Sequence, residues 1–322
     1  MSEVVLSTVD LSKHFVGKSS IVGKLRGKKP LSIPAVDGVS INIESGQTVG
    51  LVGESGCGKS TLGRTLVGLY PATGGSLSLF DQQMGTNRSL EERRLVQMIF
   101  QDPFASLNPR MKIGEMLKEI LLFHKLVTKD QVEKRSAELM ALVGLPIAAL
   151  DSYPRQFSGG QRQRIGIARA LALEPKILIA DEAVSALDVS VQASIVNLLL
   201  DLKRDLGLTM LFISHNIAIV RQISDRIAVM YLGRIVEEGP TEEVFNNPQH
   251  PYTKLLLSSV PKMTPGSKLG EAPQGELPSM QALYLGCRFL SRCPISTAAC
   301  EVTDPQLLQI NASGHTAACI NL

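Results

Sequence analysis

The stretch GESGCGKST, from Gly53 to Thr61, constrains the fold of this chain more than any other part of the sequence. The apolar run TVGLV precedes it and LGRTLVGL follows it, an order that predicts a strand, a glycine-rich loop and a helix. The glycines let the backbone wrap around phosphates, and the start of the helix adds a favourable dipole. We therefore predict a phosphate-binding loop made by Gly53, Glu54, Ser55, Gly56, Cys57, Gly58, Lys59, Ser60 and Thr61.

Charged and hydroxyl side chains give this loop a specific chemistry. We expect Lys59 to bring positive charge to the β- and γ-phosphates and the Ser60 hydroxyl to bind Mg²⁺. Asp181 and Glu182 end the apolar run KILIA, where one acid can hold Mg²⁺ and the other can polarise an attacking water. The alternative is a pair of solvated acids, but the phosphate loop upstream favours the catalytic interpretation.

Two further polar residues end apolar runs. His215 follows TMLFIS and could contact the γ-phosphate and orient water, although a lone histidine is more often structural. Gln101 ends LVQMIFQ and could sense both Mg²⁺ and the attacking water, or be an ordinary residue at a strand end. The position of each residue at the end of a predicted strand favours the functional interpretation.

Apolar strands alternate with helical stretches along the chain, which predicts a parallel sheet covered on both faces. Residues 111–150 have helical apolar spacing and are expected to form a helical insert, whereas RIAVMYLGRIVEEG is typical of a hairpin. After about residue 250, Pro and Gly become frequent, which indicates a linker leading into a small terminal module.

The composition limits the function classes that need to be considered. A net charge of +3 gives no argument for nucleic acid. We find no signal peptide and no run of about 18 apolar residues, so a cytosolic location is the default. Residues 13–29 hold six Lys or Arg and no acid, which favours a solvated loop; the alternative is a loop near anionic lipid headgroups.

One more stretch makes the combination of motifs specific to one protein family. FSGGQRQRIGIARAL, from Phe157 to Leu171, follows the phosphate loop and the Gln101 loop and precedes ILIADE, SALD and His215. In this order the motifs resemble one nucleotide-binding subunit of the ABC-type ATPases, over about residues 1–250. The resemblance implies an α/β P-loop NTPase core with a mostly parallel sheet, an N-terminal antiparallel β subdomain, a helical signature subdomain at about 104–170, and a small Cys-rich extension at 251–322.

The family resemblance also implies a mechanism. Two such domains would meet head to tail and sandwich two ATP molecules, so that each signature helix start caps the γ-phosphate held by the partner. Glu182 would be the general base, with His215 and Gln101 beside it, and Asp181, Ser60 and Gln101 would serve the Mg²⁺. The remaining nucleotide contacts implied are Phe15 on the adenine, Asp188 across the seam, and Ser158, Gly159, Gly160 and Gln161 in the signature.

Three residues depart from the family pattern. Phe157 replaces the Leu that usually starts the signature, Ala183 replaces the Pro that often follows the glutamate, and Asn216 replaces the Asp that often follows the histidine. Lys59 and the other phosphate-contacting residues are intact. We therefore expect the ATPase activity to survive.

Four of the five cysteines lie near the end of the chain, with the spacing C-x5-C-x6-C-x18-C. Four thiolates can hold either a [4Fe–4S] cluster or Zn²⁺, and the spacing does not choose between them. NNPQHPYTKLLLSSVP, GELP and GCRFLSRCP resemble the tail of oligopeptide and dipeptide importers, and this resemblance favours the cluster over zinc or free thiols. The expected ligands are Cys287, Cys293, Cys300 and Cys319.

The resemblance implies an ATPase subunit that energises the import of dipeptides or oligopeptides. The expected partners are two permease subunits, a second ATPase subunit in a heterodimer and an extracytoplasmic solute-binding protein, but no nucleic acid. The chain would lie peripherally on the cytoplasmic face of the bacterial inner membrane. Two alternatives stay open: another cargo, such as a nickel chelate, glutathione or an opine-like conjugate, and a soluble ABC ATPase without a transport role.

Overall fold

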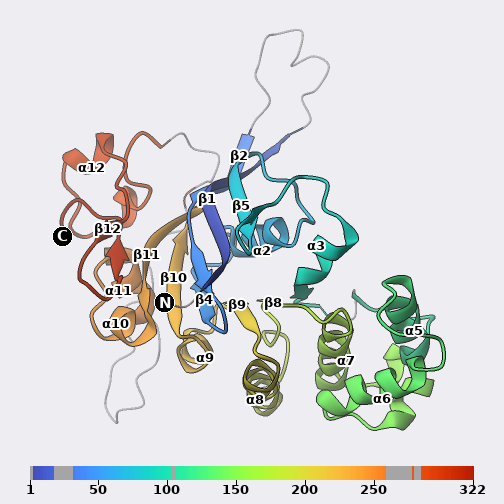
Figure 1. The fold of residues 1–322 in the computed structure, drawn as a ribbon. Coiled ribbons are helices and arrows are strands. Elements are labelled where there is room, and N and C mark those ends of the chain that lie inside the picture. The colour runs from blue at the N-terminus through green and yellow to red at the C-terminus, as the bar shows by residue number, and fades with distance from the viewer. Residues whose placement is uncertain (1–2, 18–31, 103–105, 259–277, 279–283) are drawn as a thin grey trace.

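The computed structural model describes residues 3–17, 32–102, 106–258, 278 and 284–322. Figure 1 shows two sheets in the middle of the molecule, a group of helices on the right and the C-terminal extension on the left. Most of the basic stretch 13–29 lies outside the described residues, and so does the expected linker at 260–278, apart from Pro278.

The central sheet has eight strands among the described residues, in the order β12-β13-β11-β10-β4-β9-β8-β7. The strands from β10 to β7 run parallel, and the remaining pairs are antiparallel. The mostly parallel sheet and the β10–β11 hairpin confirm the sequence predictions. The strands are β4 (Thr48–Val52), β7 (Val96–Ile99), β8 (Ile177–Asp181), β9 (Thr209–Ile213), β10 (Arg226–Tyr231), β11 (Arg234–Pro240), β12 (Leu308–Gln309) and β13 (Thr316–Ala317).

Alternation along a buried strand explains how this sheet is covered on both faces. In β8, Ile177 and Ile179 belong to one apolar core, whereas Leu178 and Ala180 belong to the other. Every residue of the strand is buried, because side chains alternate between two covered faces.

A second, antiparallel sheet contains the N-terminus and matches the predicted β subdomain. Helix α2 packs between the two sheets, where it contacts β1 and β2 on one side and β7, β8 and β9 on the other. Its position places the loop that precedes it at the end of the central strands. The elements are β1 (Val4–Val16), β2 (Ser32–Val39), β3 (Asn42–Glu44), β5 (Gly74–Leu79), β6 (Gln82–Gln83) and α2 (Lys59–Leu66).

The other helices form two groups. Those that lie near the central sheet are α3 (Leu90–Leu95), α8 (Val189–Leu206), α9 (Ile217–Ile223) and α10 (Thr241–Asn246). The helical subdomain contains α5 (Ile113–Phe123), α6 (Val132–Leu142), η1 (Ile147–Asp151), η2 (Pro154–Gln156) and α7 (Gly159–Leu171), which confirms the predicted insert. Within the described part of the chain, no helix combines the length and the apolar character needed to cross a membrane.

The C-terminal extension folds back on the core. Its strand β13 pairs with Glu237 and Glu238 of β11, so that the extension continues the central sheet. Next to this pairing, the buried His315 places Nε2 2.7 Å from a carboxylate oxygen of the buried Glu237. The elements are α11 (Pro251–Ser258), η3 (Leu290–Arg292) and α12 (Ala299–Val302), with β12 and β13.

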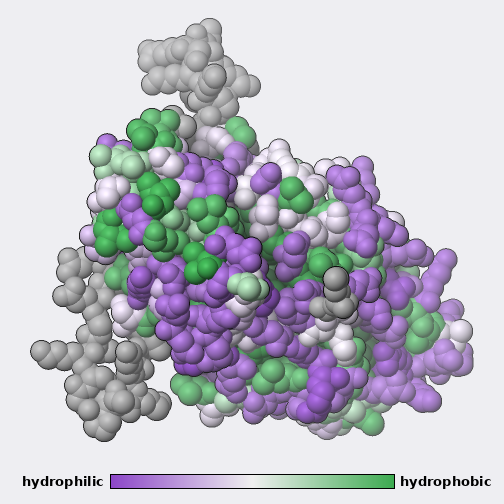
Figure 2. Space-filling model, turned by 60° about the vertical axis from the view of Figure 1, so that its left-hand side comes forward, coloured by the Kyte–Doolittle hydropathy of each residue, from purple (hydrophilic) through white to green (hydrophobic). Residues whose placement is uncertain are grey.

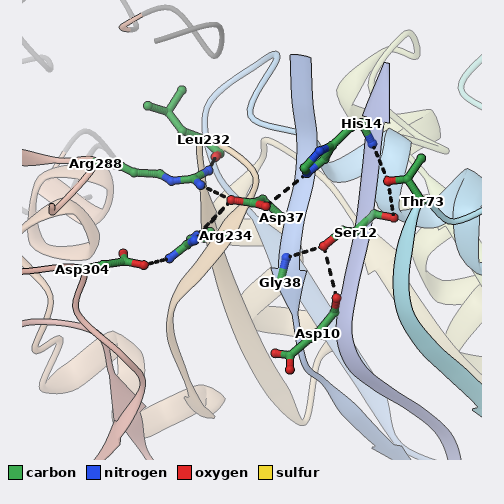
Figure 3. Close-up of polar contacts among 10 residues, drawn as sticks. All are labelled: Asp10, Ser12, His14, Asp37, Gly38, Thr73, Leu232, Arg234, Arg288 and Asp304. Atoms are coloured by element: carbon green, nitrogen blue, oxygen red, sulfur yellow. Dashed lines mark hydrogen bonds and ion pairs between the residues drawn. The ribbon is translucent and has the colours of Figure 1, made fainter. Parts of the chain in front are cut away.

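One carboxylate joins the extension to both sheets. Asp37, in β2, is paired with Arg288 of the extension, with Arg234 of β11 and with His14 of β1 (Figure 3). Arg234 also pairs with Asp304 of the extension. Burial raises the pKa of the Asp37 carboxyl, but the two guanidiniums and the His14 hydrogen bond outweigh it, so that the pKa lies below its ordinary value.

The surface of the extension carries several exposed apolar side chains. Figure 2 shows hydrophobic side chains gathered at the upper left, where the extension comes forward. The large apolar side chains exposed there include Leu285, Ile295, Val302 and Leu308.

Candidate ATP site

Close packing explains why the phosphate loop needs glycine. A Cβ on Gly53, at φ 152°, would lie 2.2 Å from the Met230 carbonyl oxygen, and a Cβ on Gly58, at φ 113°, would lie 2.1 Å from the Ala35 oxygen. The loop is therefore pressed against β10 and β2, and a side chain at either position would push it away.

The lysine of the loop is held inside it. Lys59 is 4% exposed, and its ammonium donates hydrogen bonds to the carbonyl oxygens of Gly53 at 2.8 Å and Glu54 at 2.9 Å. Its positive charge is thus positioned within the curve of the loop, where bound phosphates would need it.

Ser60 and Asp181 meet as the sequence predicts. The Ser60 hydroxyl donates to Asp181 Oδ1 at 2.7 Å, while the buried Oδ2 has no hydrogen-bond partner. Burial raises the pKa of Asp181, although Ser60 and the nearby Arg64 act against it. Arg64 Nη2 lies 3.9 Å from Oδ2, too far for a hydrogen bond. The Ser60 hydroxyl and this carboxylate form an oxygen set that fits a hard cation such as Mg²⁺.

Glu182 and His215 lie side by side at the ends of adjacent strands. The Glu182 backbone N–H donates to the Ile213 carbonyl at 2.9 Å, and Glu182 Oε2 lies 3.7 Å from His215 Nδ1. Gln101 is exposed in the bend after β7. The strands β4, β9, β8 and β7 are parallel neighbours, so their carboxyl ends lie on the same side of the sheet. This side holds the phosphate loop, His215, the two acids and Gln101.

The signature residues start α7 in the helical subdomain, which Figure 1 shows to the right of α2. Ser158 caps this helix, and Gln161 completes the capping box. A Cβ on Gly160 would come within 2.4 Å of Val191 Cγ1, so packing against α8 requires glycine there. Asp188 is exposed at the start of α8 and makes no side-chain cap.

Phe15, the residue expected to stack on adenine, lies near the end of β1. Its ring is 36% exposed and packs edge-on against Tyr70, with centroids 5.4 Å apart. The Lys13 ammonium lies 5.1 Å from the Phe15 ring centroid.

The structure shows how the three residues that depart from the family pattern are accommodated. Phe157 packs against the core, and Ala183 is buried. Asn216 caps α9, with its side-chain oxygen accepting a hydrogen bond from the Ile219 N–H at 3.4 Å. The amide thus retains a capping role that a carboxylate would also fill.

Two residues at the site were missed by sequence reasoning. The Arg292 guanidinium pairs with the Glu54 carboxylate through two contacts of 3.0 Å, and the Tyr252 hydroxyl accepts a hydrogen bond from the Glu54 N–H at 2.8 Å. Both come from the extension, far from the loop in sequence. Nothing in the sequence motifs signals these contacts, because neither residue belongs to the phosphate-loop pattern.

The four expected cysteine ligands line one small pocket in the extension, together with His250 and Phe289. Within the described residues, no group of three or more His, Cys, Asp or Glu side chains forms a metal site as it stands, so the cluster prediction is not supported. Four converging thiols are nevertheless a donor set that suits a soft metal. His315, which precedes Cys319 closely in the sequence, pairs with Glu237 and does not line this pocket.

Comparison with known proteins places the chain. A model of the ABC transporter family matches residues 36–185, and a model of the C-terminal region of oligopeptide/dipeptide transporters matches residues 236–300. The oligopeptide transport ATP-binding protein OppF of Escherichia coli is 46% identical over 99% of this chain and 97% of its own length. The chain belongs to this family of ABC transporter ATP-binding proteins.

Other family members and solved structures agree. The dipeptide transport ATP-binding protein DppF of Escherichia coli is 44% identical over 99% of this chain and 95% of its own length, and AppF of Bacillus subtilis is 46% identical over 98% and 97%. A post-hydrolysis ABC cassette bound to ADP and Pi superimposes with a TM-score of 0.63, at 27% identity, over 73% of this chain and 98% of its own. The predicted ABC-type ATPase and its fold are therefore confirmed.

Proposed function

We propose that this chain hydrolyses ATP to energise the import of oligopeptides or dipeptides. The proposal rests on the carboxyl ends of neighbouring parallel strands in the central sheet, because the phosphate loop, Asp181, Glu182 and His215 all lie there. The names of the curated relatives, which are oligopeptide and dipeptide transport proteins, support the peptide cargo.

In the proposed reaction, the loop amides and Lys59 bind the triphosphate, and Ser60 and Asp181 hold Mg²⁺, which supplies positive charge to the phosphate oxygens when bound. The oxygen of a water attacks the γ-phosphorus while the bond to the β-phosphate oxygen breaks. Glu182 accepts the proton that the water loses, and ADP and phosphate are released. His215, 3.7 Å from Glu182, orients the carboxylate, and the Gln101 side chain contacts the metal and the attacking water.

The site is proposed to be complete only in a pair of subunits. The start of α7 offers backbone N–H groups and a positive dipole end, which suit the γ-phosphate bound by a second ATPase subunit, in a heterodimer. Asp188 is exposed, as a residue at a subunit seam would be, and its neighbour Leu187 packs near Gly159 at this helix start. The residues assigned to the partner's nucleotide are Ser158, Gly159, Gly160 and Gln161, while Phe15 stacks on the adenine of its own.

A groove beside β7 is proposed to receive the permease. It holds a cavity lined by residues of α3, α5, β7 and α7 and of the segments that follow α2, β7 and α7, among them Leu69, Phe100, Ile120, Arg169 and Leu173. Because Gln101 is adjacent to Phe100, closure of the ATP site would move one wall of this groove. Two permease subunits and an extracytoplasmic solute-binding protein complete the proposed transporter, with this chain peripheral on the cytoplasmic face of the bacterial inner membrane.

Uptake and binding measurements test the proposal. Lys59→Ala should abolish nucleotide binding and the uptake of labelled peptides in cells that depend on this chain, whereas Lys176→Ala, at an exposed lysine just before β8, should leave both intact. Retained uptake of peptides with Lys59→Ala would reject the assignment. Uptake of a nickel chelate, glutathione or an opine-like conjugate in place of peptides would keep the ATPase and change the cargo. Function without any membrane partner would favour a non-transport ATPase.

The cysteine pocket supports a second proposal, that the extension holds a [4Fe–4S] cluster. The observation that favours it is the convergence of Cys287, Cys293, Cys300 and Cys319 on one pocket. Four thiolates would complete the coordination of such a cluster. Zinc remains the alternative for the same four ligands.

A further inference from the structure

An ion pair joins the C-terminal extension to the phosphate loop itself. Arg292 Nη1 and Nη2 lie 3.0 Å from Glu54 Oε2 and Oε1, respectively, in a fork-to-fork pair. The side chains are only 6% and 18% exposed, so water screens the pair weakly. Glu54 is the second residue of the loop, directly after Gly53.

The backbone of the same loop residue is held by the extension as well. The Tyr252 hydroxyl, from α11, accepts the hydrogen bond of the Glu54 N–H at 2.8 Å. The Tyr252 ring is fully buried, with centroids 4.6 Å from Tyr231 of β10 and 5.5 Å from Phe289 of the extension. A packed aromatic cluster thus fixes the hydroxyl that receives the loop amide.

The segment that carries Arg292 is itself anchored to the core. Arg288, four residues earlier in the sequence, pairs with Asp37 and donates to the Leu232 carbonyl oxygen (Figure 3). The next residue, Gly233, donates its N–H to the Cys57 carbonyl oxygen of the phosphate loop at 2.8 Å. The extension therefore contacts the loop directly through Arg292 and indirectly through the β10–β11 turn.

The ion pair of Arg292 matters for nucleotide binding because it compensates the negative charge of Glu54. Glu54 places a carboxylate in a loop whose proposed ligand is a polyanion, and like charges at close range repel. Arg292 supplies the opposite charge at contact distance. With the pair intact, the loop presents Lys59 and its amides to the triphosphate without the opposing field of Glu54.

We propose that Arg292 and Tyr252 are positioning residues for the phosphate loop, so that the affinity for ATP depends on the docked C-terminal extension. The inference rests on the proposed ATPase function and adds a requirement that lies outside the ABC cassette. Arg292 neutralises and orients Glu54, while Tyr252 fixes the backbone of the same residue.

Nucleotide titration of the full-length chain tests this inference. With a fluorescent, non-hydrolysable ATP analogue and Mg²⁺, Arg292→Ala should weaken binding by roughly ten-fold or more, because a buried carboxylate is left unpaired in the loop. Arg292→Lys keeps the charge but loses the fork, and should bind with intermediate affinity. The double variant Glu54→Gln/Arg292→Ala should recover most of the affinity that Arg292→Ala loses. Tyr252→Phe should weaken binding by a smaller factor.

Controls separate positioning from simple destabilisation. Arg221→Ala removes another bidentate pair, Arg221 with Glu242, which lies on the surface away from the loop, and should leave the affinity unchanged. If Arg292→Ala lowers only the melting temperature while its affinity stays within about two-fold of wild type, or if Glu54→Gln fails to rescue it, the inference is wrong. Absence of binding by the wild-type chain would instead reject the proposed ATPase function.

Discussion

The backbone conformation of Glu182 helps to position its carboxylate. Its φ of 47° is in the left-handed region, which costs a residue with a side chain about 1–2 kcal/mol. The hydrogen bond from its N–H to Ile213 on the neighbouring strand helps to offset this cost. The result is a half-buried carboxylate directed to His215 at the edge of the sheet.

Replacing this carboxylate should separate binding from hydrolysis. Glu182→Gln keeps the size and the backbone but cannot accept a proton, so we expect nucleotide affinity to persist while the ATP hydrolysis rate falls roughly a hundred-fold or more. Phosphate release by the assembled transporter measures the effect. Glu91→Gln, an exposed carboxylate in α3, is the matched control. Unchanged turnover in Glu182→Gln would place the base elsewhere.

Residues within one motif were predictable, but contacts between distant segments were not. The sequence motifs assigned Lys59, Ser60 and Asp181 to one site, and the structure brings Ser60 and Asp181 into contact beside the loop that holds Lys59, while their roles toward a nucleotide stay predictions. The pairing of Arg292 with Glu54 joins residues 238 positions apart and leaves no local pattern. The roles of Phe15 and Asp188 stay predictions, because they depend on a nucleotide and on a second subunit.

Among the elements, β2 connects more parts of the molecule than its short length suggests. It belongs to the antiparallel sheet, yet its Asp37 receives Arg234 from the central sheet and Arg288 from the extension (Figure 3). The two guanidiniums and His14 share one carboxylate, so that a single side chain fixes three elements.

Removing the charge of Asp37 should loosen the extension. Asp37→Asn leaves two arginines with one charged partner fewer, and we expect a loss of stability of about 1–3 kcal/mol. Thermal unfolding and limited proteolysis of the extension would detect this loss. Asp201→Asn, which removes an exposed partner of Arg204, should have a much smaller effect. Equal effects of the two variants would contradict the assigned role of Asp37.

The same carboxylate predicts the pH range of the attachment. The pKa of Asp37 is lower in the folded chain than the ordinary value of 3.8, so its stabilising contribution is complete above that value. It is lost as the pH falls through the lower, folded pKa. The attachment of the extension through Asp37 should therefore withstand mild acid.

The sequence predicted the long elements better than the short ones. The buried runs of β8 and β9 and the periodic insert at 111–150 carry enough residues for a pattern. By contrast, β12 and β13 have two residues each, too few to show any period, and their pairing with β11 depends on the folded core. For this reason the sequence did not predict that β12 and β13 extend the central sheet beyond β11.

At the scale of the whole molecule, the extension is continuous with the cassette. It adds strands to the central sheet, packs Phe289 on Tyr231 and contacts the phosphate loop. The predicted boundary near residue 250 stays a prediction, and the structure shows extensive contacts across it. Any group bound by the cysteines would therefore lie close to residues that support the ATP site.

The four cysteines that line one pocket lead to a prediction about the metal content of the whole chain. Anaerobically purified chain should contain about four irons and four sulfides, the content of a [4Fe–4S] cluster. Cys293→Ser should lose the metal because one of four ligands is removed, whereas Cys57→Ser, outside the pocket, should retain it. Elemental analysis with a sulfide assay decides the outcome. One zinc per chain would replace the cluster assignment, and an unchanged metal content in Cys293→Ser would exclude that residue as a ligand.

The pairing of β13 with β11 also has a consequence for synthesis. Glu237 pairs with Ala317 and Glu238 with Thr316, so this part of β11 lacks its strand partner until these residues have left the ribosome. During that interval β11 presents unpaired backbone groups, which are a template for pairing with another chain. Pairing with β13 covers this part of β11, and the outermost strand on that side among the described residues becomes β12, whose two residues offer only a short template to another chain.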